Sequence, residues 1–311
     1  MSKEICASRR RFYCAEGRAR ARLTSAVALF VALVVSTATP SLCQAQVASL
    51  GSAANYGLLD AGGTVNIGST FSIFDTTTSY GGVGLGNNTD VNLSLLSSLK
   101  VNGTLTEGSN VQFSGLGGVT ATTTVTGAGS TLSSAWTAAQ SASTSYSKMT
   151  ATTSISNNTI TATGAVTVVN VQSITNDLNI HGTAGQIFVI NVTSHNGTAI
   201  NLNNVTLTGV TPNDVIFNVT GNGSITFGGG TVNGTFLENG TGSVTLGSNT
   251  TLTGAILTAG TVTSLNNVTL NAAPPAAVGA PELPSVAMAG VACLLILGRA
   301  GLGRIRRARA A

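Results

Sequence analysis

Between residues 46 and 279, which we call the body, the sequence has no cysteine and no arginine. The body therefore has neither a disulfide framework nor a thiolate metal site. It has two lysines against seven acidic residues, a net charge of −5, although the whole chain has a net charge of +4. A body without a basic surface does not suit a nucleic-acid partner, and we exclude one. The chain's cysteines all lie in the end segments, at Cys6, Cys14, Cys43 and Cys293.

The body also offers little for catalysis. His181 lies close to Asp177 in the sequence and His195 lies in a polar turn, but no third histidine or cysteine completes a metal-binding set. No G-x-S-x-G elbow and no lysine-bearing phosphate loop is present. We therefore expect a protein that is not an enzyme and that has no cofactor and no metal ion.

Residues 1–45 have the pattern of a secretory signal peptide. Arginines precede the apolar run Ala26–Val35, and small residues follow it up to Ala45. A run of about ten residues is too short to cross the ~30 Å hydrocarbon core of a bilayer. We expect export and cleavage after Ala45. The segment Ser8–Phe12 ("SRRRF") leaves both the general secretory and the twin-arginine routes open.

Residues 280–311 contain an apolar run, Val286–Leu302, and arginines follow this run. These arginines would stay on the cytoplasmic side of a membrane. Before the run stand Pro281, Glu282, Leu283 and Pro284. This order resembles the PEP-CTERM sorting signal of exopolysaccharide-producing Gram-negative bacteria, although members usually read Pro-Glu-Pro and here Leu283 intervenes. The resemblance implies an exosortase-like processing peptidase and a transient transmembrane association. A plain C-terminal membrane anchor is the alternative.

The body is rich in Gly, Thr, Asn, Ser and Val, which favour short strands joined by tight corners. The segments "VTL", "ITF", "VTL" and "VTS" begin at Val205, Ile225, Val244 and Val262, at intervals of 20, 19 and 18 residues. A period near 20 with glycine corners predicts an all-β fold, a parallel β-solenoid. An antiparallel β-sandwich is the alternative. We expect inward side chains at Val205, Leu207, Ile225, Phe227, Val244 and Leu246.

Residues 130–149 break this pattern because they contain no glycine. Leu132, Trp136, Ala139, Tyr146 and Met149 fall mostly at helical spacing, which predicts an amphipathic helix lying along the solenoid.

The order of these segments resembles the choice-of-anchor A domain of bacterial surface proteins, through "VASLGSAANYGLL", the helix, "GQIFVINV", "NDVIFNVTG" and "TLTGAILTAGTV". It is more distantly similar to the microbial ice-binding family, which implies a right-handed β-solenoid flanked by a helix. Neither resemblance implies catalytic residues.

Threonine is the surface feature in excess, in T-x-T pairs whose side chains share one face of a strand. Thr251, Thr253, Thr261 and Thr263 are the candidate surface-binding residues, although threonine also simply suits exposed strands. We expect an adhesive or structural protein of the cell surface, outer membrane or extracellular biofilm matrix of a Gram-negative bacterium, with exopolysaccharide as a partner. The alternative is an ice-binding protein, which requires the threonines in register on one flat face.

Overall fold

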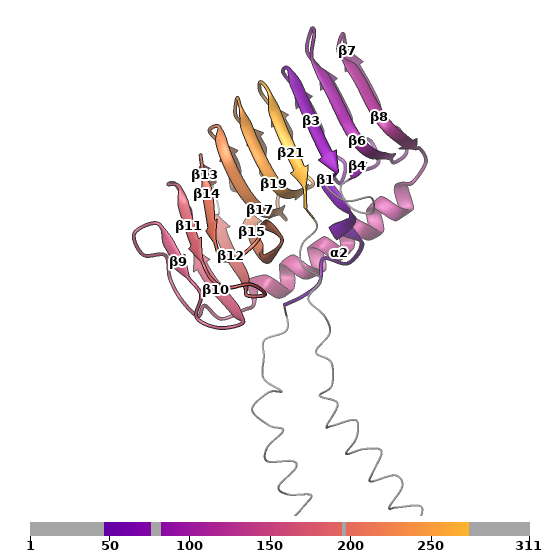
Figure 1. The fold of residues 1–311 in the computed structure, drawn as a ribbon. Coiled ribbons are helices and arrows are strands. Elements are labelled where there is room, and N and C mark those ends of the chain that lie inside the picture. The colour runs from indigo at the N-terminus through magenta and orange to yellow at the C-terminus, as the bar shows by residue number, and fades with distance from the viewer. Residues whose placement is uncertain (1–46, 76–81, 195–196, 274–311) are drawn as a thin grey trace, which may run out of the picture. The chain divides into compact units, whose positions relative to one another are not determined.

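In this computed structural model, which describes residues 47–75, 82–194 and 197–273, the body is a parallel β-solenoid with one flanking α-helix (Figure 1). The named strands all pair in parallel. The predicted fold class is confirmed, and the antiparallel sandwich is excluded. Residues 46–278 form one compact unit that contains both buried clusters, so this unit has its own core.

Several predicted features lie outside the described residues. These are the cleavage site Ala45, His195, the motif Pro281–Pro284 and the apolar run Val286–Leu302. Within the described ranges, no helix is both long and apolar enough to cross a membrane.

Each coil of the solenoid has three faces. The helix face contains β10 (Val166–Val171), β12 (Ile187–Ser194), β15 (Val215–Gly221), β1 (Tyr56–Asp60) and β4 (Gly82–Leu85). The face that we call the polar face is a seven-stranded sheet of β13 (Thr198–Leu202), β16 (Ser224–Phe227), β18 (Val244–Leu246), β20 (Val262–Ser264), β2 (Thr64–Ile67), β5 (Asp90–Leu93) and β7 (Gln112–Gly115). The third face contains β9 (Thr159–Thr161), β11 (Leu178–His181), β14 (Val205–Thr208), β21 (Val268–Ala272) and β3 (Thr70–Asp75).

Four longer strands run from the third face onto the helix face: β17 (Gly230–Glu238), β19 (Thr250–Thr258), β6 (Ser98–Glu107) and β8 (Gly118–Val125). β17 and β19 change face at Gly234 and Gly254, which lie opposite each other with φ of 130° and 144°. A Cβ on Gly254 would lie 1.9 Å from the carbonyl oxygen of Gly234. Only glycine permits both the positive φ and this close approach.

The order of the coils in space differs from their order along the chain. β1, β2 and β3 of the first coil pair with β19, β20 and β21 of the last coil. Strand β3, coloured near the indigo end of the scale, therefore lies beside β21, coloured near the yellow end (Figure 1). The helix α2 (Gly129–Ser147) makes this order possible, because it follows β8 at one end of the stack and precedes β9 and β10 at the other.

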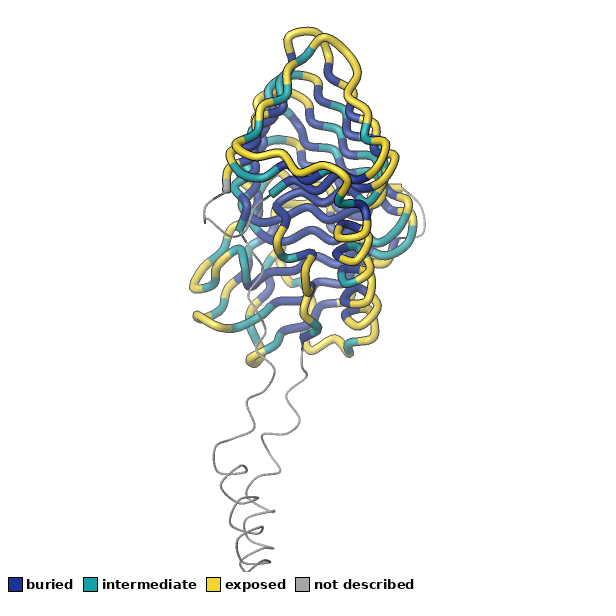
Figure 2. The backbone as a smooth tube through the Cα atoms, turned by 90° about the vertical axis from the view of Figure 1, so that its right-hand side faces the viewer, coloured by how far each residue is buried: buried dark blue, intermediate teal, exposed yellow. Residues whose placement is uncertain are grey.

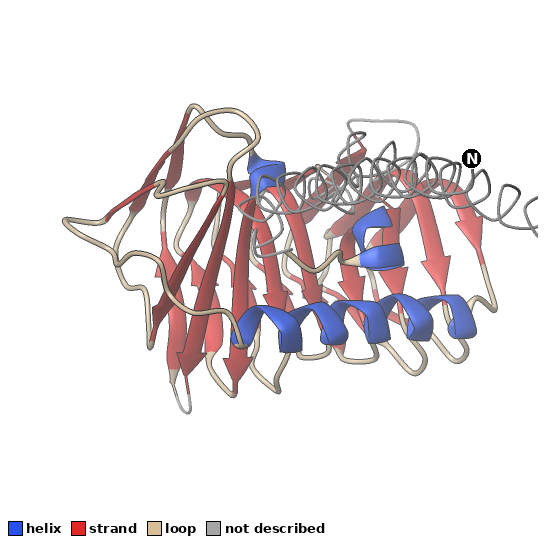
Figure 3. Ribbon diagram, turned by 90° about the horizontal axis from the view of Figure 1, so that it is seen from below, coloured by secondary structure: helices blue, strands red, loops and turns tan. Residues whose placement is uncertain are grey.

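The predicted helix over residues 130–149 is confirmed as α2, which lies along the helix face (Figure 3). Leu132, Ala139 and Tyr146 are buried against that face, and Trp136 is partly buried beside them. Alanines on the packed side of α2 allow a close approach to the sheet, which itself presents Leu, Ile and Val side chains. Two short 3-10 helices complete the fold, η1 (Gly51–Asn55) and η2 (Pro212–Asp214).

The interior of the solenoid is apolar, and exposed residues gather at the corners and the rim (Figure 2). Of the six predicted inward residues, five are fully buried and Leu207 is partly buried against the core. The predicted stacking was wrong at one step. Val205 lies on the third face, whereas Ile225, Val244 and Val262 lie on the polar face. The true partner of Ile225 is Ile200, because this coil is longer than the two that follow it.

Candidate functional site

The polar face owes its regularity to strict alternation along its strands. In β2, for example, Val65 and Ile67 point into the core while Thr64 and Asn66 point outward. Since α2 packs on the helix face, these outward side chains meet solvent. The strands of the polar face are short and pair in register, so their outward residues form ranks across the sheet.

One rank crosses all seven strands without a break in register. Each member is small, polar and uncharged, and each is at least partly exposed. This first rank consists of Asn201, Thr226, Thr245, Thr263, Asn66, Asn92 and Ser114. The face is therefore chemically uniform along the direction in which the coils stack.

A second rank lies beside the first on the N-terminal side of each strand. It consists of Thr198, Ser224, Ser243, Thr261, Thr64, Asp90 and Gln112. Thr198 pairs with Ser224, after a one-residue irregularity in β13, and Asp90 pairs with both Thr64 and Gln112. Ser243 and Thr261 directly precede β18 and β20. Asp90, near one end of the rank, is the single charged residue in the two ranks. Together the ranks place two polar side chains on, or directly before, every strand of the polar face.

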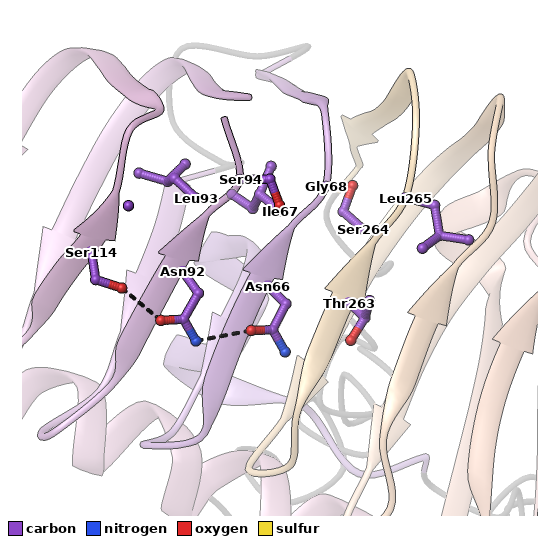
Figure 4. Close-up of a pocket in the computed structure, with 11 residues that line it drawn as sticks. Asn66, Ile67, Gly68, Asn92, Leu93, Ser94, Ser114, Thr263, Ser264 and Leu265 are labelled. Atoms are coloured by element: carbon purple, nitrogen blue, oxygen red, sulfur yellow. Dashed lines mark hydrogen bonds between the residues drawn. The ribbon is translucent and has the colours of Figure 1, made fainter. Parts of the chain in front are cut away.

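Hydrogen bonds within the ranks fix several of these side chains. The Asn92 amide donates to the Asn66 side-chain oxygen at 2.9 Å, and the Ser114 hydroxyl donates to the Asn92 side-chain oxygen at 2.7 Å (Figure 4). In the second rank, the hydroxyls of Ser243 and Ser224 are 3.2 Å apart. Side chains bonded along the rank are already ordered before any ligand arrives.

The spacing of the array follows from strand geometry. Neighbouring strands lie ~4.8 Å apart, and residues i and i+2 of one strand lie ~6.7 Å apart. The two ranks thus form a rectangular array of hydroxyl, amide and methyl groups. A layer of fully buried apolar residues supports it, including Ile225, Val244 and Val262. Behind Phe227, the ring of Phe236 packs edge-on with centroids 4.8 Å apart, which makes the base of the face rigid.

The third face carries a shorter and less uniform array. Thr231, Thr251 and Thr269 lie in register on β17, β19 and β21. The same rank continues through Ser72 to Lys100. In the neighbouring rank Phe74, which is 43% exposed, stands between Asn271 and Asn102. A cation and a protruding ring therefore interrupt the third face where the polar face is continuous.

The structure separates the four candidate threonines. Thr261 and Thr263 lie in the two ranks of the polar face, whereas Thr251 and Thr253 lie on β19 of the third face. The four residues therefore do not form a single array. Each pair belongs to a different array of in-register side chains, and only the array with Thr261 and Thr263 is continuous and nearly free of charge.

Most residues of the first rank were missed in the sequence because they do not form T-x-T pairs. Their signal is a single polar residue between two buried apolar ones, as in "VNI" at Val65, "VNL" at Val91 and "ITF" at Ile225. These triplets predict inward residues correctly, and the middle position of each is the outward member of the rank.

A shallow hollow of about 320 Å³ lies where the polar face meets the corner after β20, β2 and β5 (Figure 4). Gly68, Gly115 and Leu265 are among the residues that line it. The buried hydroxyl of Ser264 also lines it and has no hydrogen-bond partner among the described residues. The hollow is shallow and open to solvent, so it does not enclose a substrate.

Ionisable groups in the described residues do not gather into a catalytic or metal-binding cluster. His181 is exposed on β11, opposite Thr161 and Thr208. Asp60 and Glu238 are fully buried at corners, where burial raises the pKa of each carboxyl group. Their oxygens accept hydrogen bonds from corner backbone N–H groups, including Gly63 for Asp60 and Gly242 for Glu238, so both have structural roles.

No protein-family model and no curated protein sequence matches the chain. Among solved structures, it is similar to an ice-binding protein from the Antarctic ascomycete Antarctomyces psychrotrophicus, with 20% identity over 73% of this chain and 98% of the other, and a TM-score of 0.48. It is also similar to the ice-binding protein LeIBP of an Arctic yeast, with 17% identity over 77% of this chain and 99% of the other, and a TM-score of 0.44. A third similar structure is the DUF3494 domain of Shewanella frigidimarina ice-binding protein 1, with 12% identity over 73% of this chain and 98% of the other, and a TM-score of 0.43. Because these TM-scores lie below 0.5, conclusions about function must come from the faces themselves.

Proposed function

We propose that this chain is an exported, non-enzymatic ice-binding protein that adsorbs to ice through its polar face. The observation that carries this proposal is the first rank, in which seven small uncharged side chains lie in register across seven strands. A crystalline surface repeats in two dimensions, and the polar face offers a matching kind of repeat.

The chemistry of the ranks suits a surface made of water. Hydroxyl and amide groups exchange hydrogen bonds with water in both directions, while threonine methyl groups restrict the orientations of water beside them. Threonine side chains are stiff at χ1, and Asn66 and Asn92 are held by their mutual hydrogen bond. Binding therefore costs little side-chain entropy, which is the benefit of a preorganised surface.

The near-absence of charge supports the same proposal. A charged side chain binds its own water shell strongly, and that shell must be disrupted before the face can meet ordered water. Across the two ranks only Asp90 is charged, and it lies on β5 near one end of the sheet.

The adhesive function expected from the sequence requires no such register. A flexible polysaccharide can be held by scattered polar groups, so it does not account for a straight rank across a whole sheet. The polar face therefore favours the ice-binding alternative over the adhesive or matrix function.

Delivery is the second part of the proposal and rests on the sequence of the ends. A cleaved signal peptide would export the body, and an exosortase-like peptidase would act at Pro281–Pro284. The protein would then work at the cell surface or outside the cell.

The test uses residues 46–278, which contain a complete core. This purified unit should shape ice crystals into facets and lower the freezing point below the melting point at micromolar to millimolar concentrations. A fluorescent derivative should remain on the surface of a single ice crystal after washing. Round, freely growing crystals and no retained fluorescence would contradict the proposal.

A further inference from the structure

The two ends of the solenoid differ in whether other residues cover their last strands. At the end formed by β9 and β10, residues 149–158 cover the last coil. The backbone N–H of Thr152 donates to the carbonyl oxygen of Val168 at 2.9 Å, and the N–H of Val168 donates to the Thr152 hydroxyl at 2.9 Å. The unpaired edge of β10 is thereby occupied. Such capping is what a β-solenoid needs to stay soluble.

The opposite end, drawn at the upper right of Figure 1, has no such cover among the described residues. Its last strands are β7, which pairs only with β5, and β8, which pairs only with β6. Large apolar side chains are exposed here. Phe113, in register with the buried Val91, is 39% exposed, and Leu116 in the following turn is 78% exposed. Of the seven exposed large apolar side chains in the described residues, five lie in or beside this end: Leu95, Leu96, Phe113, Leu116 and Val125.

This end also lacks the usual protection against pairing with another strand. Edge strands are commonly shielded by lysine, other charges or proline. Residues 108–128, which include both β7 and β8, contain no Asp, Glu, Lys, Arg, His or Pro. The N–H of Gly118 bonds to the carbonyl oxygen of Ser97, so by alternation the N–H groups of Val119 and Ala121 point to the open side.

We propose that this open end pairs with the same end of a second copy of the chain. Two uncharged ends can meet without electrostatic cost, and a two-fold axis would place β8 antiparallel to β8 of the second copy. The coil-on-coil contact that runs through the whole solenoid would then continue across the dimer. Phe113 and Leu116 would be buried between the two copies, as inward residues are buried within each copy.

The dimer does not depend on the proposed function, but it would extend it. Two polar faces joined end to end present two linked binding surfaces, and linked surfaces bind together more tightly than separate ones. Dimerisation is measured without ice, so its failure and the failure of ice binding are distinguishable.

The test is sedimentation velocity over a range of concentrations, on residues 46–278 and on the full chain. We expect a reversible dimer. Phe113→Glu should raise its dissociation constant at least about tenfold, because a charge would be buried at the contact. Ala121→Pro, which removes an N–H on the open side, should do the same. Thr120→Glu adds the same charge on the outer face of β8 and should change the constant less than about twofold, as expected for a charge left in solvent.

Hydrogen exchange of the wild-type unit tests the dimer even if a variant unfolds. In the wild-type unit, protection of residues 111–125 should rise with protein concentration. A monomer at all concentrations, or a dimer that both Phe113→Glu and Ala121→Pro leave intact, would overturn the proposal. Strong protection of β8 in a monomeric full chain, but not in residues 46–278, would overturn it in favour of the chain's own apolar C-terminal segment as the cover.

Discussion

The side-chain amide of Asn191 donates a hydrogen bond to the backbone carbonyl oxygen of Tyr146 at 2.8 Å, which ties β12 to α2. Asn191 is the middle of a ladder, because Asn170 and Asn218 lie opposite it on β10 and β15. Each asparagine donates to a backbone carbonyl oxygen. Asn218 and Asn191 donate to Ser143 and Tyr146 of α2, and Asn170 donates to Met149, two residues after the helix ends. Three residues of helix rise ~4.5 Å, close to the ~4.8 Å between strands, so helix and sheet stay in register.

The first prediction concerns this ladder. Asn191 also donates to Asn170 at 2.9 Å and accepts from Asn218 at 2.8 Å. Asn191→Leu should lower the free energy of unfolding by about 2–4 kcal/mol, because it removes all three hydrogen bonds that the buried Asn191 side chain makes. Asn170→Leu is the matched control at the exposed end of the ladder and should cost less than about 1 kcal/mol. Urea unfolding of residues 46–278 measures both. Equal losses would contradict the larger cost assigned to the buried position.

The second prediction compares two buried hydroxyls. In the part of the chain that the structure describes, the Ser264 hydroxyl has no hydrogen-bond partner, whereas the Thr250 hydroxyl donates to the carbonyl oxygen of Gly247 at 2.8 Å. Ser264→Ala should therefore stabilise the protein by about 1 kcal/mol, since an unpaired polar group leaves the core. Thr250→Val should destabilise it by about 1 kcal/mol or more for the opposite reason. Thermal unfolding of both variants is the measurement, and a destabilised Ser264→Ala would mean that its hydroxyl is paired in solution.

The solenoid could be predicted from the sequence because strands and corners are local features. Alternation in triplets such as "VTL" at Val244 shows which residues point inward, and glycine-free residues 130–149 show the helix. The order of the coils could not be predicted in this way. The pairing of β1 with β19 joins residues about 200 apart, and no local pattern indicates it. The polar face depends on this pairing, because Asn66 reaches Thr263 only when the first coil stacks on the last.

The third prediction concerns pH. Burial raises the pKa of Glu238, against hydrogen bonds from Thr258 and Gly242 that lower it. The pKa of Glu238 is therefore higher in the folded state than in the unfolded state, where it has its ordinary value of 4.5. The resulting contribution to stability is fully present below pH 4.5 and is lost as pH rises through the folded-state pKa. In Glu238→Gln the side-chain oxygen still accepts from Gly242, the amide nitrogen donates to the Thr258 hydroxyl, and the titrating carboxyl is gone. The variant should therefore gain stability relative to wild type as pH rises from 4.5.

The matched control for this pH dependence has the opposite sign. Hydrogen bonds from Asn204 lower the pKa of the exposed Asp177, so its contribution is present above pH 3.8 and is lost as pH falls. Asp177→Asn should therefore lose stability mainly above pH 3.8, and its difference from wild type should shrink in acid. Urea midpoints between pH 3 and 8 distinguish the two variants. Parallel curves for wild type and Glu238→Gln would contradict the structural reason given for Glu238.

The last prediction asks which face meets ice. Thr263 lies in the first rank of the polar face, and Thr251 lies on the third face, where Lys100 continues its rank. A tyrosine at either position projects a ring above the array and holds that face away from a flat surface. Because both threonines are only partly exposed, on strands with buried neighbours, each variant is checked for an unchanged unfolding midpoint. Thr263→Tyr should abolish most of the thermal hysteresis, while Thr251→Tyr should retain it. The reverse result would assign ice binding to the third face, and loss in both variants would mean that the two faces act together around their shared corner.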